Sequence, residues 1–219
     1  MIKSYFIEEI ANIWRIHFDV EANDIYIELR YETEFELRSV KDNRRFKTPK
    51  YEQYVQNILS VQYPYALISY RTIDNLLEDQ IIVMYNLEKE KEEWMSSEFR
   101  VEEVFNKCLR VYHPKISPKQ TYLIDFNKDI IDSELNFTRN LVIKYAENSN
   151  DGIVIKDVNR IYHYSVTDQM LNVFENNELY YSDSFELEEL YNKEYDYMLM
   201  MNNALIVLLG KHKLKLYEV

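Results

Sequence analysis

Residues 24–37 read DIYIELRYETEFEL, and in this stretch every second residue is apolar or β-branched. Successive side chains of a β-strand point to opposite faces, so the pattern predicts a long strand with one face against a core. The alternate positions carry Glu28, Glu32, Glu34 and Glu36. We therefore expect a strand with a buried apolar face and an acidic face that is exposed to water.

Five other segments place apolar residues at helical spacing, and several are flanked by helix-start signals. Thr48 followed by Pro49 supplies a capping hydroxyl and then the residue that best tolerates the first helical position. Asp183 with Glu186 has the form of a capping box. The predicted helices cover residues 4–18, 49–63, 96–112, 132–145 and 185–201.

Short apolar runs between these helices predict further strands. The clearest turn signal is Asn150-Asp151-Gly152, and Asn176-Asn177 suits a hairpin because Asn tolerates positive φ. A hairpin around residues 32–34 would divide the first long strand. The other predicted strands cover residues 65–70, 80–87, 121–126, 153–156, 161–166, 170–174 and 179–181, with a terminal hairpin over 204–218.

These elements predict an α+β fold, a largely antiparallel β-sheet with four or five helices packed on it. The chain lacks linkers rich in Gly, Pro or Ser, so we expect residues 1–219 to form a single compact domain. The mixed-sign charge run at 88–93 marks a candidate subdomain boundary near 88–96. A basic segment, 41–50, is interpreted as a solvated loop, with phosphate binding as the alternative.

Charge and cysteine content limit the class of partner and the compartment. The chain carries 26 Lys and Arg against 38 Asp and Glu, a net charge of −12. A field of this sign opposes phosphate backbones, so we expect no direct nucleic-acid binding and favour a basic protein partner. The alternative is that the acidity only maintains solubility. The single cysteine, the missing signal-peptide pattern and the short apolar runs predict a cytoplasmic protein with no membrane span.

Most familiar cofactor-binding motifs are absent from the sequence. With only Gly152 and Gly210, the chain has neither a P-loop nor a dinucleotide-binding loop, and we expect no cofactor. The four histidines have no Cys or His at ligand spacing, which argues against a zinc site, and we expect no bound metal. Cys108 falls late in a predicted helix, where the helix dipole disfavours a thiolate, so we interpret it as a core residue.

Four small sets of residues are nevertheless of the types used in acid/base catalysis or in metal-dependent nucleases. They are His17 with Asp19; His163 between two tyrosines; Asp24, Glu28 and Arg30; and Asp151 with Lys156. Each set also has a simpler structural explanation, such as the water-facing ladder of the long strand. We therefore favour a non-catalytic function over an enzyme of unrecognised type.

The favoured hypothesis is an acidic inhibitor or immunity-type protein that binds a basic partner, such as a nuclease toxin or a nucleic-acid-binding defence complex. The alternative is a non-catalytic structural or scaffold subunit of a bacterial or phage complex, which would use some of the 20 tyrosines as interface anchors. The partner-binding residues predicted under the first hypothesis are Glu28, Glu32, Glu34, Glu36, Glu188, Glu189, Glu194 and Asp196.

Overall fold

A computed structural model shows an all-β chain. It describes residues 2–19, 21–32, 34–51, 54–72, 80–105, 108–125, 130–131, 143–186, 198–202 and 204–219. Within these ranges the chain forms 22 β-strands and no α-helix. The predicted α+β fold is therefore wrong, because segments expected to be helices are strands. No helix in the described part of the chain is long and apolar enough to cross a membrane.

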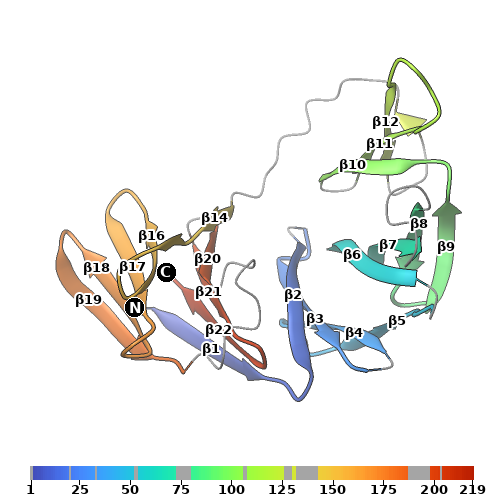
Figure 1. Cartoon of the computed structure of the whole chain (residues 1–219). Helices are drawn as coiled ribbons and strands as arrows, with labels where there is room; N and C mark the ends of the chain where they lie inside the picture. Colours follow the sequence, from blue (N-terminus) through green and yellow to red (C-terminus); the bar gives the residue numbers. More distant parts are fainter. Residues whose placement is uncertain are drawn as a thin grey trace. The chain divides into compact units, whose positions relative to one another are not determined.

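The strands group into two compact units, Trp14–Asn140 and Met1–Ile13 with Leu141–Val219. The first unit holds three antiparallel sheets, each made of four strands that follow one another in the chain (Figure 1). Sheet B consists of β2 (Asn12–Asp19), β3 (Asp24–Arg30), β4 (Phe35–Ser39) and β5 (Arg45–Thr48). Sheet C consists of β6 (Tyr54–Gln62), β7 (Tyr65–Thr72), β8 (Gln80–Asn86) and β9 (Lys91–Ser96). Sheet D consists of β10 (Arg100–Phe105), β11 (Cys108–Tyr112), β12 (Thr121–Asp125) and β13 (Ile130–Ile131).

The second unit holds two five-stranded antiparallel sheets. Sheet E follows the chain and consists of β15 (Glu147–Asn148), β16 (Gly152–Lys156), β17 (Arg160–Ser165), β18 (Met170–Glu175) and β19 (Glu178–Ser184). Sheet A has the order β1-β22-β21-β20-β14 and consists of β1 (Lys3–Glu8), β14 (Ile143–Tyr145), β20 (Met198–Met201), β21 (Leu205–Leu209) and β22 (Lys213–Glu218).

Sheet A joins the two ends of the chain. The first strand, β1, pairs with the last strand, β22, in an antiparallel ladder that runs from Lys3 opposite Glu218 to Glu8 opposite Lys213 (Figure 1). The terminal hairpin of β21 and β22 confirms the strands predicted over 204–218. The sheet that contains the C-terminus is thus completed by the N-terminus.

Sheets in the same unit pack face to face through apolar cores. In the first unit, Leu37 of sheet B and Ile68 of sheet C lie in one core, and Ile82 of sheet C and Val111 of sheet D lie in a second. In the second unit, Val173 of sheet E packs with Ile206 of sheet A. Removing these apolar faces from water is the main driving force that holds such sheets together.

The helices predicted over 4–18, 49–63 and 96–112 are wrong, because β1, β2, β6, β10 and β11 occupy these segments. The helices over 132–145 and 185–201 lie largely outside the described residues; strands β14 and β20 occupy 143–145 and 198–201, and the described residues 185–186 have no regular structure. The basic segment 41–50 is not only a loop, since Arg45–Thr48 forms β5. The hairpin expected around residues 32–34 is confirmed by the pairing of β3 with β4.

Candidate functional site

Glu28 does not lie on an exposed acidic face. Glu28 is only 1 % exposed, because both faces of β3 are buried. The carboxylate accepts hydrogen bonds from Nε of Arg30 at 3.0 Å and contacts Nε2 of His17 at 3.1 Å. Burial alone raises the pKa of Glu28, but the hydrogen bonds and charges of His17 and Arg30 outweigh it and lower this pKa below its usual value. Glu28 is therefore a buried structural carboxylate.

Two other glutamates of this hairpin, Glu34 and Glu36, are matched by cations on β5. Glu34 binds Nζ of Lys47 at 2.8 Å, and Glu36 accepts a hydrogen bond from Nη1 of Arg45 at 3.0 Å. Glu32 is exposed, and its backbone carbonyl accepts a hydrogen bond from Lys50. Acidic residues of the first long strand segment and basic residues of segment 41–50 thus neutralise each other as ion pairs within one hairpin.

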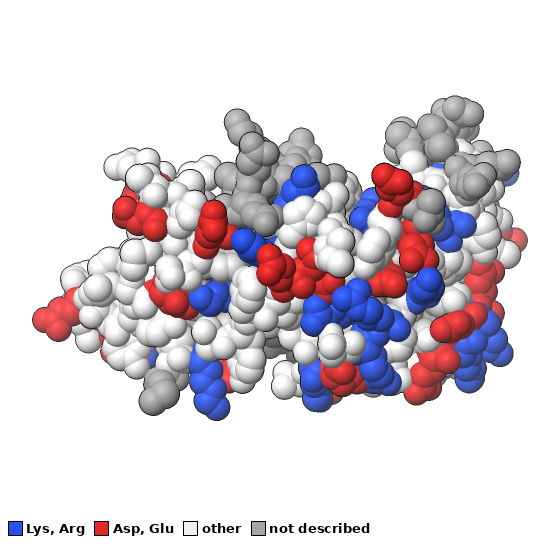
Figure 2. Space-filling view, turned by 90° about the horizontal axis from the view of Figure 1, so that it is seen from below, with Lys and Arg blue, Asp and Glu red and all other residues white. Residues whose placement is uncertain are grey.

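The second predicted acidic surface, Glu188, Glu189, Glu194 and Asp196, lies outside the described residues. Figure 2 shows a face of the molecule on which Lys and Arg atoms border Asp and Glu atoms, instead of a uniformly acidic surface. Acidic and basic side chains are therefore mixed on this face, although the net charge of the whole chain is −12.

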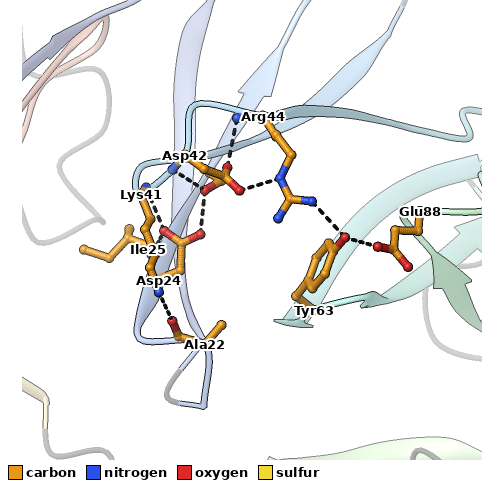
Figure 3. Close-up of polar contacts among 9 residues, drawn as sticks. Ala22, Asp24, Ile25, Lys41, Asp42, Arg44, Tyr63 and Glu88 are labelled. Carbon is orange, nitrogen blue, oxygen red and sulfur yellow. Dashed lines mark hydrogen bonds and ion pairs between the residues drawn. The ribbon is translucent and has the colours of Figure 1, made fainter.

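A different group of residues comes together where three turns meet, between sheets B and C (Figure 3). We call Asp42, Arg44, Tyr63 and Glu88 the loop-end cluster. Asp42 and Arg44 lie in the turn between β4 and β5, Tyr63 lies in the turn between β6 and β7, and Glu88 lies in the turn between β8 and β9.

Two buried aspartates hold these turns in place by accepting hydrogen bonds from backbone N–H groups. Asp19 accepts hydrogen bonds from the backbone N–H groups of Glu21, Ala22 and, at 2.7 Å, Tyr63. Asp24 accepts from the backbone N–H of Ile25 and of Lys41 and from the hydroxyl of Ser39 (Figure 3). Such bonds from a short carboxylate to nearby backbone are typical of turns. These carboxylates are structural, and both are already used by the fold.

The side chain of Tyr63 is held from several directions. Its hydroxyl accepts a hydrogen bond from Nη1 of Arg44 at 2.9 Å and donates one to Glu88 at 2.5 Å (Figure 3). The Arg44 guanidinium lies 4.7 Å from the centre of the Tyr63 ring, and the ring of Phe46 lies 5.9 Å away. Burial, followed by the bond to Glu88, raises the pKa of Tyr63, which keeps the hydroxyl protonated.

Arg44 is fixed as firmly as the tyrosine. Its Nε donates to Asp42, and hydrogen bonds to Tyr63 and Asp42 raise the pKa of the guanidinium. Its side chain is 49 % exposed, so the pair remains accessible from water. The sequence contains no motif for this pair. Its only local signals are Tyr63-Pro64, which favours a turn, and the basic segment 41–50.

The catalytic candidates from the sequence do not form reactive groupings in the described residues. His17 contacts Glu28, whereas Asp19 is used by backbone N–H groups, so the predicted His17–Asp19 pair does not form. The side chain of His163 meets Ser149 at 3.1 Å and Asp151 at 3.0 Å, but both contacts involve the same nitrogen, Nε2. A Ser–His–Asp relay needs the serine and the carboxylate on different ring nitrogens.

The thiol and the metal candidates have structural roles as well. Cys108 is buried at the start of β11, so its predicted place in the core is confirmed although its helix is not. Asp24, Glu28 and Arg30 lie on β3, with Asp24 used by turns and Glu28 by cations. No group of three or more His, Cys, Asp or Glu that could hold a metal ion occurs within the described ranges.

Comparisons with known proteins found only distant similarities to solved structures. No protein-family model matches the sequence, and no curated protein does. Similar solved structures include Hsv2 of Kluyveromyces lactis, with 8 % identity, a TM-score of 0.34, and coverage of 91 % of this chain and 74 % of that chain. Protein lmo1340 of Listeria monocytogenes has 12 % identity and a TM-score of 0.38 over 93 % and 76 % of the two chains. The Dos1 propeller has 9 % identity and a TM-score of 0.35 over 94 % and 68 %.

Proposed function

We propose that this chain is a non-catalytic protein-binding subunit and that the loop-end cluster is part of its contact surface. The observation that carries the proposal is the Arg44–Tyr63 pair. Tyr and Arg are the residue types enriched among the few side chains that supply most binding energy at protein interfaces. Here both stand at the ends of turns, where loops on a rigid scaffold are used most often for recognition.

The fixed geometry of Tyr63 supports this proposal further. Ordering a side chain at an interface normally costs about 0.5–1.5 kcal/mol. The hydrogen bonds of its hydroxyl with Arg44 and Glu88 order the side chain of Tyr63 before any partner arrives, and the bond of its backbone N–H to Asp19 fixes the backbone. A partner that covers this ring therefore avoids most of that loss. We also propose a cytoplasmic location, which the single buried cysteine supports.

The test compares two Arg–Tyr pairs in the same chain. Tyr63→Ala removes the proposed anchor, and Tyr180→Ala removes a control ring, 46 % exposed, that Arg160 covers at 5.2 Å in the other unit. Each tagged variant is used for affinity capture from host lysate, with retained proteins quantified by mass spectrometry. We expect the wild type and Tyr180→Ala to retain the same partner protein. The amount of that protein retained by Tyr63→Ala should be lower by about tenfold or more.

Equal capture by all three proteins would contradict the proposal, and so would a wild type that retains nothing. Tyr63→Phe serves as a second variant, because it keeps the ring and removes only the hydroxyl between Arg44 and Glu88. A loss seen in Tyr63→Ala with intact tryptophan fluorescence is a loss of binding and not of folding.

An acidic inhibitor of a basic partner is the second candidate, favoured by the net charge of −12 and by the exposed carboxylates of Glu88, Glu90 and Glu92. Salt distinguishes the two functions. A partner held by charge is released between about 50 and about 500 mM salt, whereas a partner anchored on Tyr63 stays bound.

A further inference from the structure

Three tyrosines form a second aromatic surface on sheet C. The rings of Tyr51 and Tyr70 are 5.1 Å apart and inclined by 73°, and Tyr54 lies 6.4 Å from each of them at angles near perpendicular, 81° and 78°. Edge-to-face contacts of this kind are favourable beyond the area they bury. We call Tyr51, Tyr54 and Tyr70 the tyrosine surface.

Local backbone structure places these rings together. The N–H of Tyr54, the first residue of β6, donates to the carbonyl of Tyr51 at 3.0 Å. Tyr54 pairs with Thr72 and Gln56 pairs with Tyr70, so Tyr54 and Tyr70 lie on the same face of sheet C. Tyr70 is fully buried and forms the floor, whereas Tyr51 is 43 % exposed.

An adaptable apolar side chain lies on the same face. Met95 of the edge strand β9 is exposed and stands opposite Val83, which belongs to the core between sheets B and C. Methionine adjusts its shape to different partners and makes favourable contacts with aromatic rings. An exposed combination of Tyr and Met is unlike an ordinary charged surface.

Carboxylates border the tyrosine surface. The hydroxyl of Tyr51 donates to Oε1 of Glu92, and this bond, followed by burial and the charge of Glu92, raises the pKa of Tyr51 to about 12. The side chain of Glu92 is exposed, and so is that of Glu90 in the preceding turn. A cation of a partner can therefore reach carboxylate oxygens beside the rings.

Within the chain, one of these tyrosines already binds the carbonyl of a proline. The hydroxyl of Tyr70 donates to the backbone carbonyl of Pro49 at 2.9 Å. Extended proline-rich backbone has no internal hydrogen bonds, so its carbonyls are free to accept from tyrosine hydroxyls. The flanking Lys50 and Tyr51 continue from this proline onto the surface.

We propose that the tyrosine surface binds an extended segment of a partner protein that contains prolines and at least one Lys or Arg. A polyproline helix is already extended before it binds, which limits its entropy loss, and exposed aromatic rings are the side chains on which such segments dock. The Lys or Arg pairs with Glu92 or Glu90. This surface shares no residue with the loop-end cluster and goes beyond the function proposed for it.

The test uses the full chain and three fluorescently labelled peptides of equal length. The first is proline-rich with two arginines, the second is proline-rich with two glutamates, and the third is rich in glycine and serine with two arginines. We expect saturable anisotropy changes with the first peptide and binding about tenfold weaker or more with the other two.

Variants then assign the binding to the tyrosine surface. Tyr51→Ala removes the exposed ring, and Glu92→Gln removes the border charge; both should weaken the arginine-proline peptide about tenfold. Tyr145→Ala, which truncates an exposed tyrosine in the other unit, should leave the affinity unchanged. Tyr63→Ala should also leave it unchanged, so a failure of the loop-end proposal is distinguishable from a failure of this one.

Three results would overturn the proposal. One is equal affinity for the glycine-serine peptide, which would show attraction by charge alone. Another is unchanged affinity in Tyr51→Ala, which would place the peptide elsewhere. The third is no saturable binding of the first peptide at concentrations up to about 1 mM, the weak end of specific recognition.

Discussion

Replacing Glu28 by glutamine should destabilise the unit of sheets B, C and D far more than any other neutralisation in the β3–β4 hairpin. The carboxylate is fully buried and meets Nε2 of His17 and both Nε and Nη2 of Arg30 within 3.1 Å. Removing one member of a buried ion pair costs about 3–5 kcal/mol, because the remaining charge loses its partner. Glutamine keeps one acceptor oxygen, so we expect about 3 kcal/mol, which lowers the melting temperature by about 6–12 °C for a chain of this size.

The assay benefits from the position of the tryptophans. Both of them, Trp14 and Trp94, lie in this unit, and the Arg30 guanidinium lies 4.0 Å from the Trp14 ring. Tryptophan fluorescence in a denaturant titration therefore reports the unfolding of this unit. Glu34→Gln is the matched control, because its ion pair with Lys47 is exposed and its loss should produce no resolvable change.

The effect of Glu28→Gln should also depend on pH. Folding lowers the pKa of Glu28, so the unfolded chain binds a proton more readily than the folded chain does. The stabilisation is then complete above the unfolded value of about 4.3 and is lost as the pH falls through the folded value. The gap between wild type and variant should begin to narrow as the pH falls below about 4.3 and should close below the folded pKa of Glu28. A gap under about 1 kcal/mol at neutral pH, or one that stays constant in acid, would refute this account of the buried carboxylate.

Three further outcomes follow from single residues. Gly152→Ala should destabilise sheet E by about 3 kcal/mol, measured by circular dichroism, because the added Cβ would lie 1.9 Å from the backbone oxygen of Tyr164; an unchanged melting temperature would contradict the packing at this site. Glu92→Gln should lower the pKa of Tyr51 from about 12 toward 10.0, measured by NMR of isotope-labelled tyrosine, and an unchanged pKa would show that the bond to Glu92 is absent. Cys108 is 1 % exposed, so a thiol reagent should modify it only in denaturant, and rapid labelling of the native chain would place it elsewhere.

The sequence predicted the strands better than the class of the fold. The expected strands at 65–70, 80–87 and 121–126 correspond to β7, β8 and β12. The Asn176-Asn177 hairpin is confirmed, with φ of 53° and 68° at the two asparagines. These features depend on local signals, namely alternation and turn chemistry, that do not require knowledge of distant partners.

Two of the false helices, over 49–63 and 96–112, have a specific physical origin in β-bulges. In β6 the register shifts between Ile58 and Ser60, so the buried residues Gln56, Ile58 and Val61 are spaced by two and then by three. A register shift between Val101 and Glu103 does the same in β10, where Val101 and Val104 both pack on the core. One extra residue changes the side-chain period from two toward 3.6, and the pattern then resembles a helix.

The misplacement of Glu28 arose from tertiary structure that alternation cannot report. Alternation assigns residues to two faces, but it does not say whether the second face is covered. Here both faces of β3 are buried, and the side chains that bind Glu28 are His17 on β2 and Arg30 on the same strand. The loop-end cluster was missed for a related reason, since Arg44, Tyr63 and Glu88 lie in three separate turns.

The pairing of β1 with β22 determines how the molecule responds to force. Lys3 and Glu218 form the first pair of the ladder, so the two ends of the chain leave sheet A side by side. A pull that separates these ends loads the interstrand hydrogen bonds one pair at a time, because those bonds are perpendicular to the strands. The hydrogen bonds between β1 and β22 should therefore break in sequence at small force. When a molecule attached near one end of the chain is pulled away from the other end, sheet A should be the first part of the chain to unfold.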